Sequence, residues 1–140
     1  MFSTSTAPDL AETVTEAIRA HRDHVAADNR RSYWPSIEET AGRFSTIGEA
    51  VVEVELRIRF GKRYVSYDKD DEYTIAFTAS ARCTGHGCTD PRHQQPATDT
   101  FLLDDDADKS AAAALLSVAA VRKWAQTHAG TCRALRYDGR

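Results

Sequence analysis

The clearest pattern in the chain is an alternation of apolar and charged residues in VVEVELRIRF, residues 51–60. Such alternation predicts a β-strand with one buried face and one solvated face. After the polar turn DKDD, the segment EYTIAFTASARC, residues 72–83, repeats the pattern. The two segments together predict a long antiparallel hairpin whose second strand ends at Cys83. Because the parity of the apolar residues changes after Gly61, we expect a β-bulge at that glycine.

Three other segments carry apolar residues at helical spacing. In the first, Leu10, Val14 and Ile18 form a narrow stripe, which we expect to be available for self-association as a homodimer. In the second, Ser36 and Glu39 fit a capping box, and a short helix is expected to end near Gly48. The third follows an acidic run that suits the positive end of a helix dipole. The three predicted helices cover residues 7–27, 36–48 and 109–130.

The order of these elements predicts an α+β fold. It has two N-terminal helices, an antiparallel hairpin or three-stranded sheet, and a C-terminal helix tied to the sheet by a zinc site. A third strand would be TDTFLL, residues 98–103. We expect residues 1–49 to form an N-terminal helical segment packed on or extending the core, and residues 50–140 to form a zinc-stabilised ββ(β)α domain. The chain has 140 residues with 41% hydrophobic content and no apolar run near the length of a membrane-spanning helix.

Candidate chemistry is concentrated in two pairs of residues. Cys83 and Cys88 flank the glycine-containing loop CTGHGC, and His128 and Cys132 flank the end of the last predicted helix. Both pairs have spacings used by tetrahedral zinc sites. Because His128 lies on the helix face expected to look toward the sheet, all four residues can meet at one point. We therefore predict a structural Zn²⁺ bound by Cys83, Cys88, His128 and Cys132.

Two alternatives remain open for these cysteines. They are free buried thiols, or Cys83 and Cys88 form a disulfide. His86 and His93 are the further histidines that could replace a predicted ligand. The arrangement resembles the Cys-Cys-His-Cys variant of ββα-type zinc fingers over residues 51–132, which implies two cysteines from a hairpin and two ligands from a helix end. The 39 residues between Cys88 and His128 exceed the usual spacing, so the resemblance is carried over for the ligand set only.

The surface pattern offers candidate contacts for partners. Arginines gather on the polar face of the first strand, and RRSYW mixes arginine with aromatic residues, as in many nucleic-acid and protein contacts. The helix–strand–strand–strand–helix order is also that of double-stranded-RNA-binding domains. Those domains need lysines at the start of the last helix, whereas this chain has aspartates there. The candidate contact residues are Arg57, Arg59, Arg63, Arg30, Arg31 and Trp34.

These features predict a non-enzymatic binding or adaptor module stabilised by zinc, with a protein as its first expected partner. The alternatives are a DNA- or RNA-associated accessory or regulatory factor and, third, a small metal-dependent enzyme. The net charge of −3 gives no general attraction to nucleic acid or to anionic membranes. The start of the chain lacks the pattern of a secretion signal, and an odd cysteine count is typical of a reducing compartment, so we expect a cytoplasmic protein.

Overall fold

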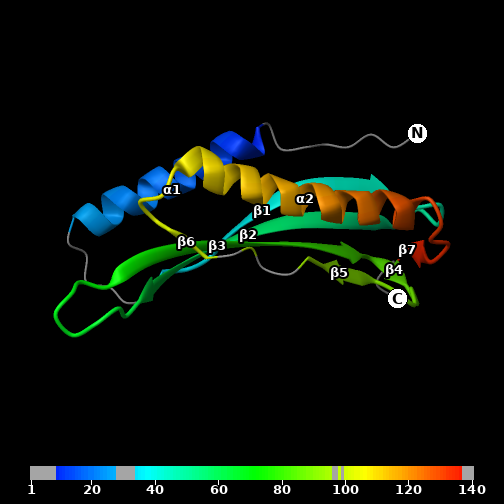
Figure 1. The fold of residues 1–140 in the computed structure, drawn as a ribbon. Helices are drawn as coiled ribbons and strands as arrows, with labels where there is room; N and C mark the ends of the chain where they lie inside the picture. The colour runs from blue at the N-terminus through cyan, green and yellow to red at the C-terminus, as the bar shows by residue number, and fades with distance from the viewer. Residues whose placement is uncertain (1–8, 28–33, 96–97, 99, 137–140) are drawn as a thin grey trace.

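The computed structural model describes residues 9–27, 34–95, 98 and 100–136, and it contains two layers. One layer is an antiparallel sheet, and the other is a pair of helices that cover one face of that sheet (Figure 1). In chain order the elements are α1 (Leu10–Ala26), β1 (Ile37–Ser45), β2 (Val51–Arg63), β3 (Glu72–Cys83), β4 (Gly85–His86), β5 (Arg92–Gln94), β6 (Phe101–Leu102), α2 (Ala107–Ala129) and β7 (Leu135–Arg136).

The predicted long hairpin is confirmed as β2 and β3. These strands pair continuously from Val52 opposite Cys83 to Arg63 opposite Glu72. The bulge expected at Gly61 is wrong, because this residue sits in regular register and β2 ends at Arg63. The main sheet has the order β1-β2-β3-β5, and the short strand β6 also pairs with β3. A second, two-stranded sheet of β4 and β7 lies beside the end of α2 (Figure 1).

The second N-terminal helix predicted over residues 36–48 is wrong, since this segment forms strand β1 and the turn after it. A β-bulge between Thr40 and Gly42 explains the error. The extra residue shifts the strand's parity, so that Ile37, Ala41 and Phe44 turn toward the helices together. Their spacing of four and then three residues is that of a helical stripe. The fold therefore has one N-terminal helix in its described residues.

The core lies between the helices and the sheet. It takes side chains from both parts of the predicted division, residues 1–49 and residues 50–140. The apolar stripe of α1 is buried in it, with Val14 and Ile18 almost fully covered. This stripe is therefore occupied within the chain, contrary to the expectation that it is free for self-association. The predicted division at residue 49 stays a prediction, although both sides of it share one core. The largest fully buried apolar side chains are Phe44, Phe77, Ile18, Leu56, Ile58, Ile75, Val14, Val52, Val54 and Val121.

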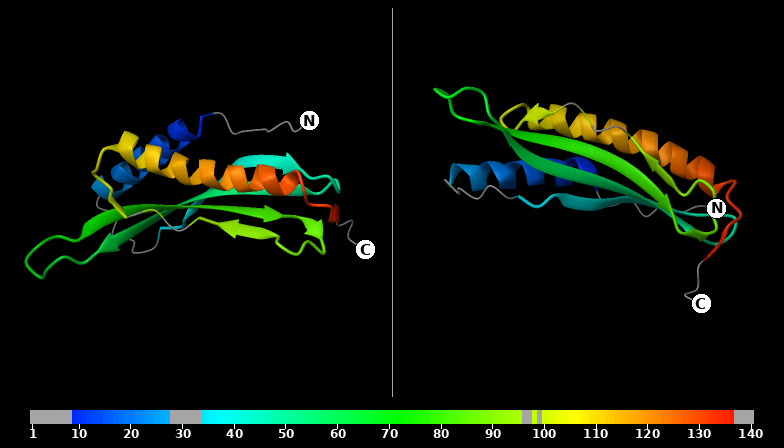
Figure 2. Two further views of the ribbon diagram at one scale, coloured as in Figure 1. Left: turned by 45° about the vertical axis from the view of Figure 1, so that its right-hand side comes forward. Right: turned by 90° about the horizontal axis from the view of Figure 1, so that it is seen from below.

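Side-chain contacts join α1 to the rest of the fold. Arg22 donates to the carbonyl oxygens of Leu103 and Asp105, which precede α2. Figure 2 shows α1 and α2 on the same face of the sheet in both views. No helix among the described residues is long and apolar enough to cross a membrane.

His21 is a buried polar side chain on the inner face of α1. Its ring stacks on Phe60 at 4.1 Å and meets Trp34 edge-on at 5.1 Å. Its Nε2 has no hydrogen-bond partner among the described residues. Burial lowers the pKa of His21 below its ordinary value, and the nearby His24 lowers it further. The fold therefore favours the neutral imidazole.

Replacing His21 with phenylalanine is expected to make the protein less sensitive to acid. A lowered pKa in the folded state means that the unfolded chain binds a proton more readily, so stability is present above about pH 6.5 and is lost as the pH falls below it. Urea unfolding of wild type and His21→Phe at about pH 7.5 and about pH 5.5 measures this loss. A wild-type loss no larger than that of the variant would contradict the assignment.

Candidate metal centre

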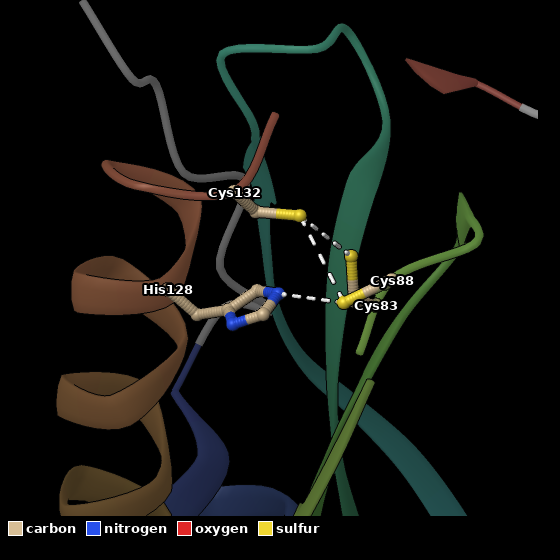
Figure 3. Close-up of side chains that lie close together, drawn as sticks. All are labelled: Cys83, Cys88, His128 and Cys132. Carbon is tan, nitrogen blue, oxygen red and sulfur yellow. Dashed lines mark hydrogen bonds between the residues drawn. The ribbon is translucent and has the colours of Figure 1, made fainter. Parts of the chain in front are cut away.

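Four side chains from distant parts of the sequence converge at one end of the molecule. Cys83 is the last residue of β3, and Cys88 follows the short strand β4. His128 lies in the last turn of α2, and Cys132 lies three residues beyond the end of that helix. All four ligand atoms lie within 4.8 Å of one another, and they face a common point in Figure 3. The predicted convergence of the two pairs is confirmed.

Three of the six distances between the ligand atoms match the edges of a zinc tetrahedron, and all six are within 4.8 Å. With Zn–S bonds of about 2.3 Å, two sulfur ligands lie about 3.8 Å apart. The Sγ of Cys132 lies 3.8 Å from the Sγ of Cys83 and 3.8 Å from the Sγ of Cys88. With a Zn–N bond of about 2.0 Å, the edge between sulfur and nitrogen is about 3.5 Å. The Sγ of Cys88 lies 3.4 Å from the Nε2 of His128. Three sulfurs and one imidazole nitrogen this close together can hold a metal ion.

The structure contradicts one of the two alternatives for the cysteines, the disulfide. All three thiols are free, so the structure contains no Cys83–Cys88 disulfide. The pKa of Cys83 is raised to about 11, mainly because the thiol is buried. The N–H of Gly85 has an opposite effect that is smaller than that of burial, and the neighbouring sulfurs of Cys132 and Cys88 also raise the pKa. Without a cation, the buried Cys83 thiol therefore resists ionisation. A bound Zn²⁺ would supply the positive charge that three converging thiolates need.

The two further histidines lie outside the group of four. His86 pairs with Leu135 in the small β4–β7 sheet. His93 stacks on Trp124, whose other neighbour in the stack is the ring of His128. The ring centroids of Trp124 and His128 are 4.7 Å apart and the planes differ by 12°. The stack of His93, Trp124 and His128 therefore holds the plane of the His128 imidazole. The sequence did not predict this supporting role for His93.

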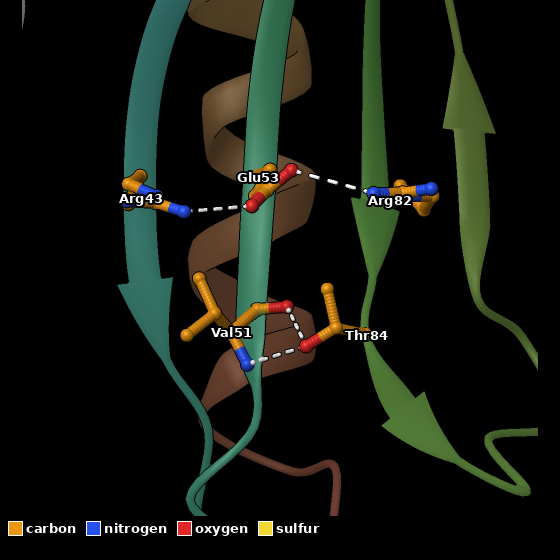
Figure 4. Close-up of polar contacts among 5 residues, drawn as sticks. All are labelled: Arg43, Val51, Glu53, Arg82 and Thr84. Carbon is orange, nitrogen blue, oxygen red and sulfur yellow. Dashed lines mark hydrogen bonds and ion pairs between the residues drawn. The ribbon is translucent and has the colours of Figure 1, made fainter. Parts of the chain in front are cut away.

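Backbone contacts fix the elements that carry the ligands. The hydroxyl of Thr84, directly after Cys83, donates to the Val51 carbonyl and accepts from the Val51 N–H (Figure 4). On the helix side, the N–H of Gly48 donates to the carbonyl of Cys132. A Cβ at Gly48 would lie 2.1 Å from the carbonyl oxygen of Ala134, so only glycine allows this approach. The turn between β1 and β2 thus holds the ligand-bearing segment after α2.

No family model matches this chain, and no curated protein or solved structure matches it significantly. The ligand set therefore depends on the geometry of these four residues. The cluster brings together the end of the main sheet, at Cys83, and the end of the 23-residue helix α2, at His128.

The arginines predicted as partner contacts lie on the open face of the sheet, away from the metal centre. Arg57 forms an ion pair with Glu38 at 2.9 Å, and Arg63 forms one with Glu72 at 2.6 Å. Arg59 is exposed. Further along this face, Glu53 lies between two more arginines, as Figure 4 shows. Acidic side chains therefore offset much of the positive charge that the sequence places here.

The other predicted contact residues divide into two groups. Trp34 packs against His21 and Tyr73, so its ring belongs to the junction between α1 and the sheet. Arg30 and Arg31 lie outside the described residues. Their role as contacts stays a prediction.

Proposed function

We propose that this protein is a non-enzymatic binding module whose fold is stabilised by one structural Zn²⁺. The observation that carries the proposal is the cluster of three sulfurs and one imidazole nitrogen, all within 4.8 Å of one another and with three of their distances close to tetrahedral values. Thiolate-rich sites with four protein ligands are typical of structural zinc. Because the ligands come from the end of β3 and the end of α2, the metal would join the two layers of the fold.

A metal-dependent enzyme is less well supported by the same arrangement. Catalytic zinc sites keep one position open for water or substrate. Here three thiols and one histidine supply a full set of four ligands. The protein side chains would therefore occupy the positions that a reactant needs.

A protein partner is supported by the turn between β2 and β3, at the opposite end of the sheet from the metal centre (Figure 1). We define the hairpin tip as residues 64–71. Tyr67 is 94% exposed and Tyr64 is 69% exposed, and Val65 is also exposed. At the base of the tip, the ion pairs of Lys62 with Asp71 and of Arg63 with Glu72 hold the two strands together. Large exposed tyrosines on a supported hairpin are typical of protein contacts.

A nucleic-acid partner is less well supported. Binding to phosphate requires cations whose charge is not already compensated. Arg57 and Arg63 are paired with glutamates on the sheet face. The start of α2 carries aspartates, with Asp106 acting as its N-cap. On the sheet face and at the start of α2, acidic side chains would therefore repel the phosphates of a nucleic acid.

One experiment on the wild-type protein separates these functions. The protein is purified without added zinc, its metal content is measured by native mass spectrometry, and the same sample is used in gel-shift assays at two salt concentrations. We expect one zinc ion per chain and no shift of DNA or RNA. A shift that weakens with rising salt would favour the nucleic-acid alternative. A folded protein without zinc would contradict the structural metal centre.

A further inference from the structure

The surface of α2 that faces away from the sheet is apolar and unoccupied by the described part of the chain. Leu116 is 74% exposed at its centre. The neighbouring side chains on this surface are the small residues Ala112, Ala119 and Ala120, all exposed. We call these four residues the α2 face. A leucine so exposed on a helix of 23 residues, about 35 Å long, indicates a surface on which another helix can pack.

Two hollows flank the α2 face along the line where α1 and α2 meet, and Leu115 lines both of them. The first hollow, of about 460 Å³, is acidic and is lined by Glu12 and Asp108. The second, of about 390 Å³, is basic and is lined by Arg122 and Lys123. The two hollows therefore carry opposite charge at the two ends of one apolar surface.

The charges at the ends of this surface have no ion-pair partners within the described residues. Asp108 and Lys123 take part in no ion pair there, and neither does Glu12. On the open face of the sheet, by contrast, acidic and basic side chains alternate and pair. The helix layer thus keeps an acidic end and a basic end apart, with apolar residues between them.

We propose that the α2 face is the interface of a homodimer in which α2 packs antiparallel against α2 of a second copy. A two-fold axis near Leu115 and Leu116 would bring Asp108 of one copy to Lys123 of the other. The same axis would place Ala112 opposite Ala119 of the second copy, where two small residues allow the helices to approach closely. An interface of this kind is self-complementary, as two-fold symmetry requires.

Charge is what favours a second copy over an unrelated partner. Around its hollow, the acidic end has the carboxylates of Asp9, Glu12 and Asp108. Lys109 is the single basic residue in the first turns of α2 and offsets one of these charges. The basic end has Arg122 and Lys123 around its hollow. An antiparallel second copy matches each end with its opposite, whereas a parallel copy would bring like charges together. The exposed Leu116 side chains then lie at the centre of the interface.

Light scattering during gel filtration of the full zinc-loaded chain, over a range of concentrations, tests the proposal. We expect wild type to reach the mass of two 15.5-kDa chains. Leu116→Lys should weaken association by about 100- to 10,000-fold, because the dimer loses the burial of two leucines, one from each copy. Leu135→Lys is the matched control, because Leu135 is 71% exposed on β7 and should leave the mass unchanged. Circular dichroism and zinc content should stay constant in both variants.

Charge reversal tests the antiparallel arrangement. Lys123→Glu alone and Asp108→Lys alone should each weaken the dimer, and the double variant should restore it, because the pair is re-formed with its signs exchanged. A wild-type protein that stays monomeric at all concentrations would overturn the proposal, whether the α2 face then takes another segment or another protein. A dimer that is unaffected by Leu116→Lys, or charge variants without restoration, would also overturn it.

Discussion

Replacing Cys132 with serine is expected to release the zinc ion and to destabilise the whole fold. Cys132 is at the centre of the ligand group, 3.8 Å from each of the other two sulfurs. Structural zinc contributes about 10–16 kcal/mol of binding free energy in small finger peptides, and that energy is also folding energy. We expect the melting temperature to fall by roughly 10 °C or more. Cys83→Ser, Cys88→Ser and His128→Ala should act in the same direction.

Three measurements report this loss. Native mass spectrometry shows whether the zinc ion is bound, and circular dichroism shows the melting temperature. Tryptophan fluorescence should also change, because the indole of Trp124 stacks on His128. His86→Ala is the control, since His86 lies in the same loop region but outside the ligand group, and it should keep the zinc. Wild-type protein that melts at the same temperature in a strong chelator would show that no metal supports the fold.

Removing residues 1–27 is expected to abolish cooperative folding. Val14 and Ile18 are almost fully buried against the sheet and α2, and Leu10 is buried at the edge of the same core. Each such side chain contributes about 1.5–3 kcal/mol on burial, so their joint loss is comparable to the whole stability of a domain. The loss of Arg22 would also leave the carbonyl oxygens of Leu103 and Asp105 without their donor.

A milder pair of variants separates burial from truncation. Ile18→Ala should lower the free energy of unfolding by about 2–5 kcal/mol, measured by urea titration. Glu16→Ala changes the exposed face of the same helix, where Glu16 forms a solvent-exposed ion pair with Arg19, and it should have little effect. A truncated chain that stays folded and binds zinc would return α1 to the role of an independent, self-associating helix.

Local sequence patterns were reliable where one element had one buried face in regular geometry. The alternation in β2 and β3 identified both strands, because a strand in a sheet with one covered face must place every second residue in the core. The apolar spacing of α1 and α2 likewise identified both helices. In β1 the bulge brought Ala41 and Phe44 to one face at helical spacing, and pattern alone could not separate the two structures.

For the metal centre, the sequence by itself determined the ligand types and their two local pairs. Cys83 and Cys88 flank one loop, and His128 and Cys132 flank one helix end, because residues close in sequence stay close in any fold. Only the tertiary structure decided that the two pairs meet, with all four ligand atoms within 4.8 Å of one another. The 39 residues between the pairs include two short strands and most of α2, and the packing of α2 on the sheet sets where they end.

The surface shows the same division. The sequence determined that Arg57 lies on the wet face of a strand, since alternation fixes the face of each residue, whereas Arg63 lies beyond the bulge that was wrongly expected at Gly61. Only the register between strands decided that Glu38 and Glu72 stand beside them and offset their charge. The apolar stripe of α1 was also visible in the sequence. Whether it packs against the sheet of its own chain or against a second copy depended on the tertiary structure. Periodicity identifies a buried face, and long-range packing alone determines what buries it.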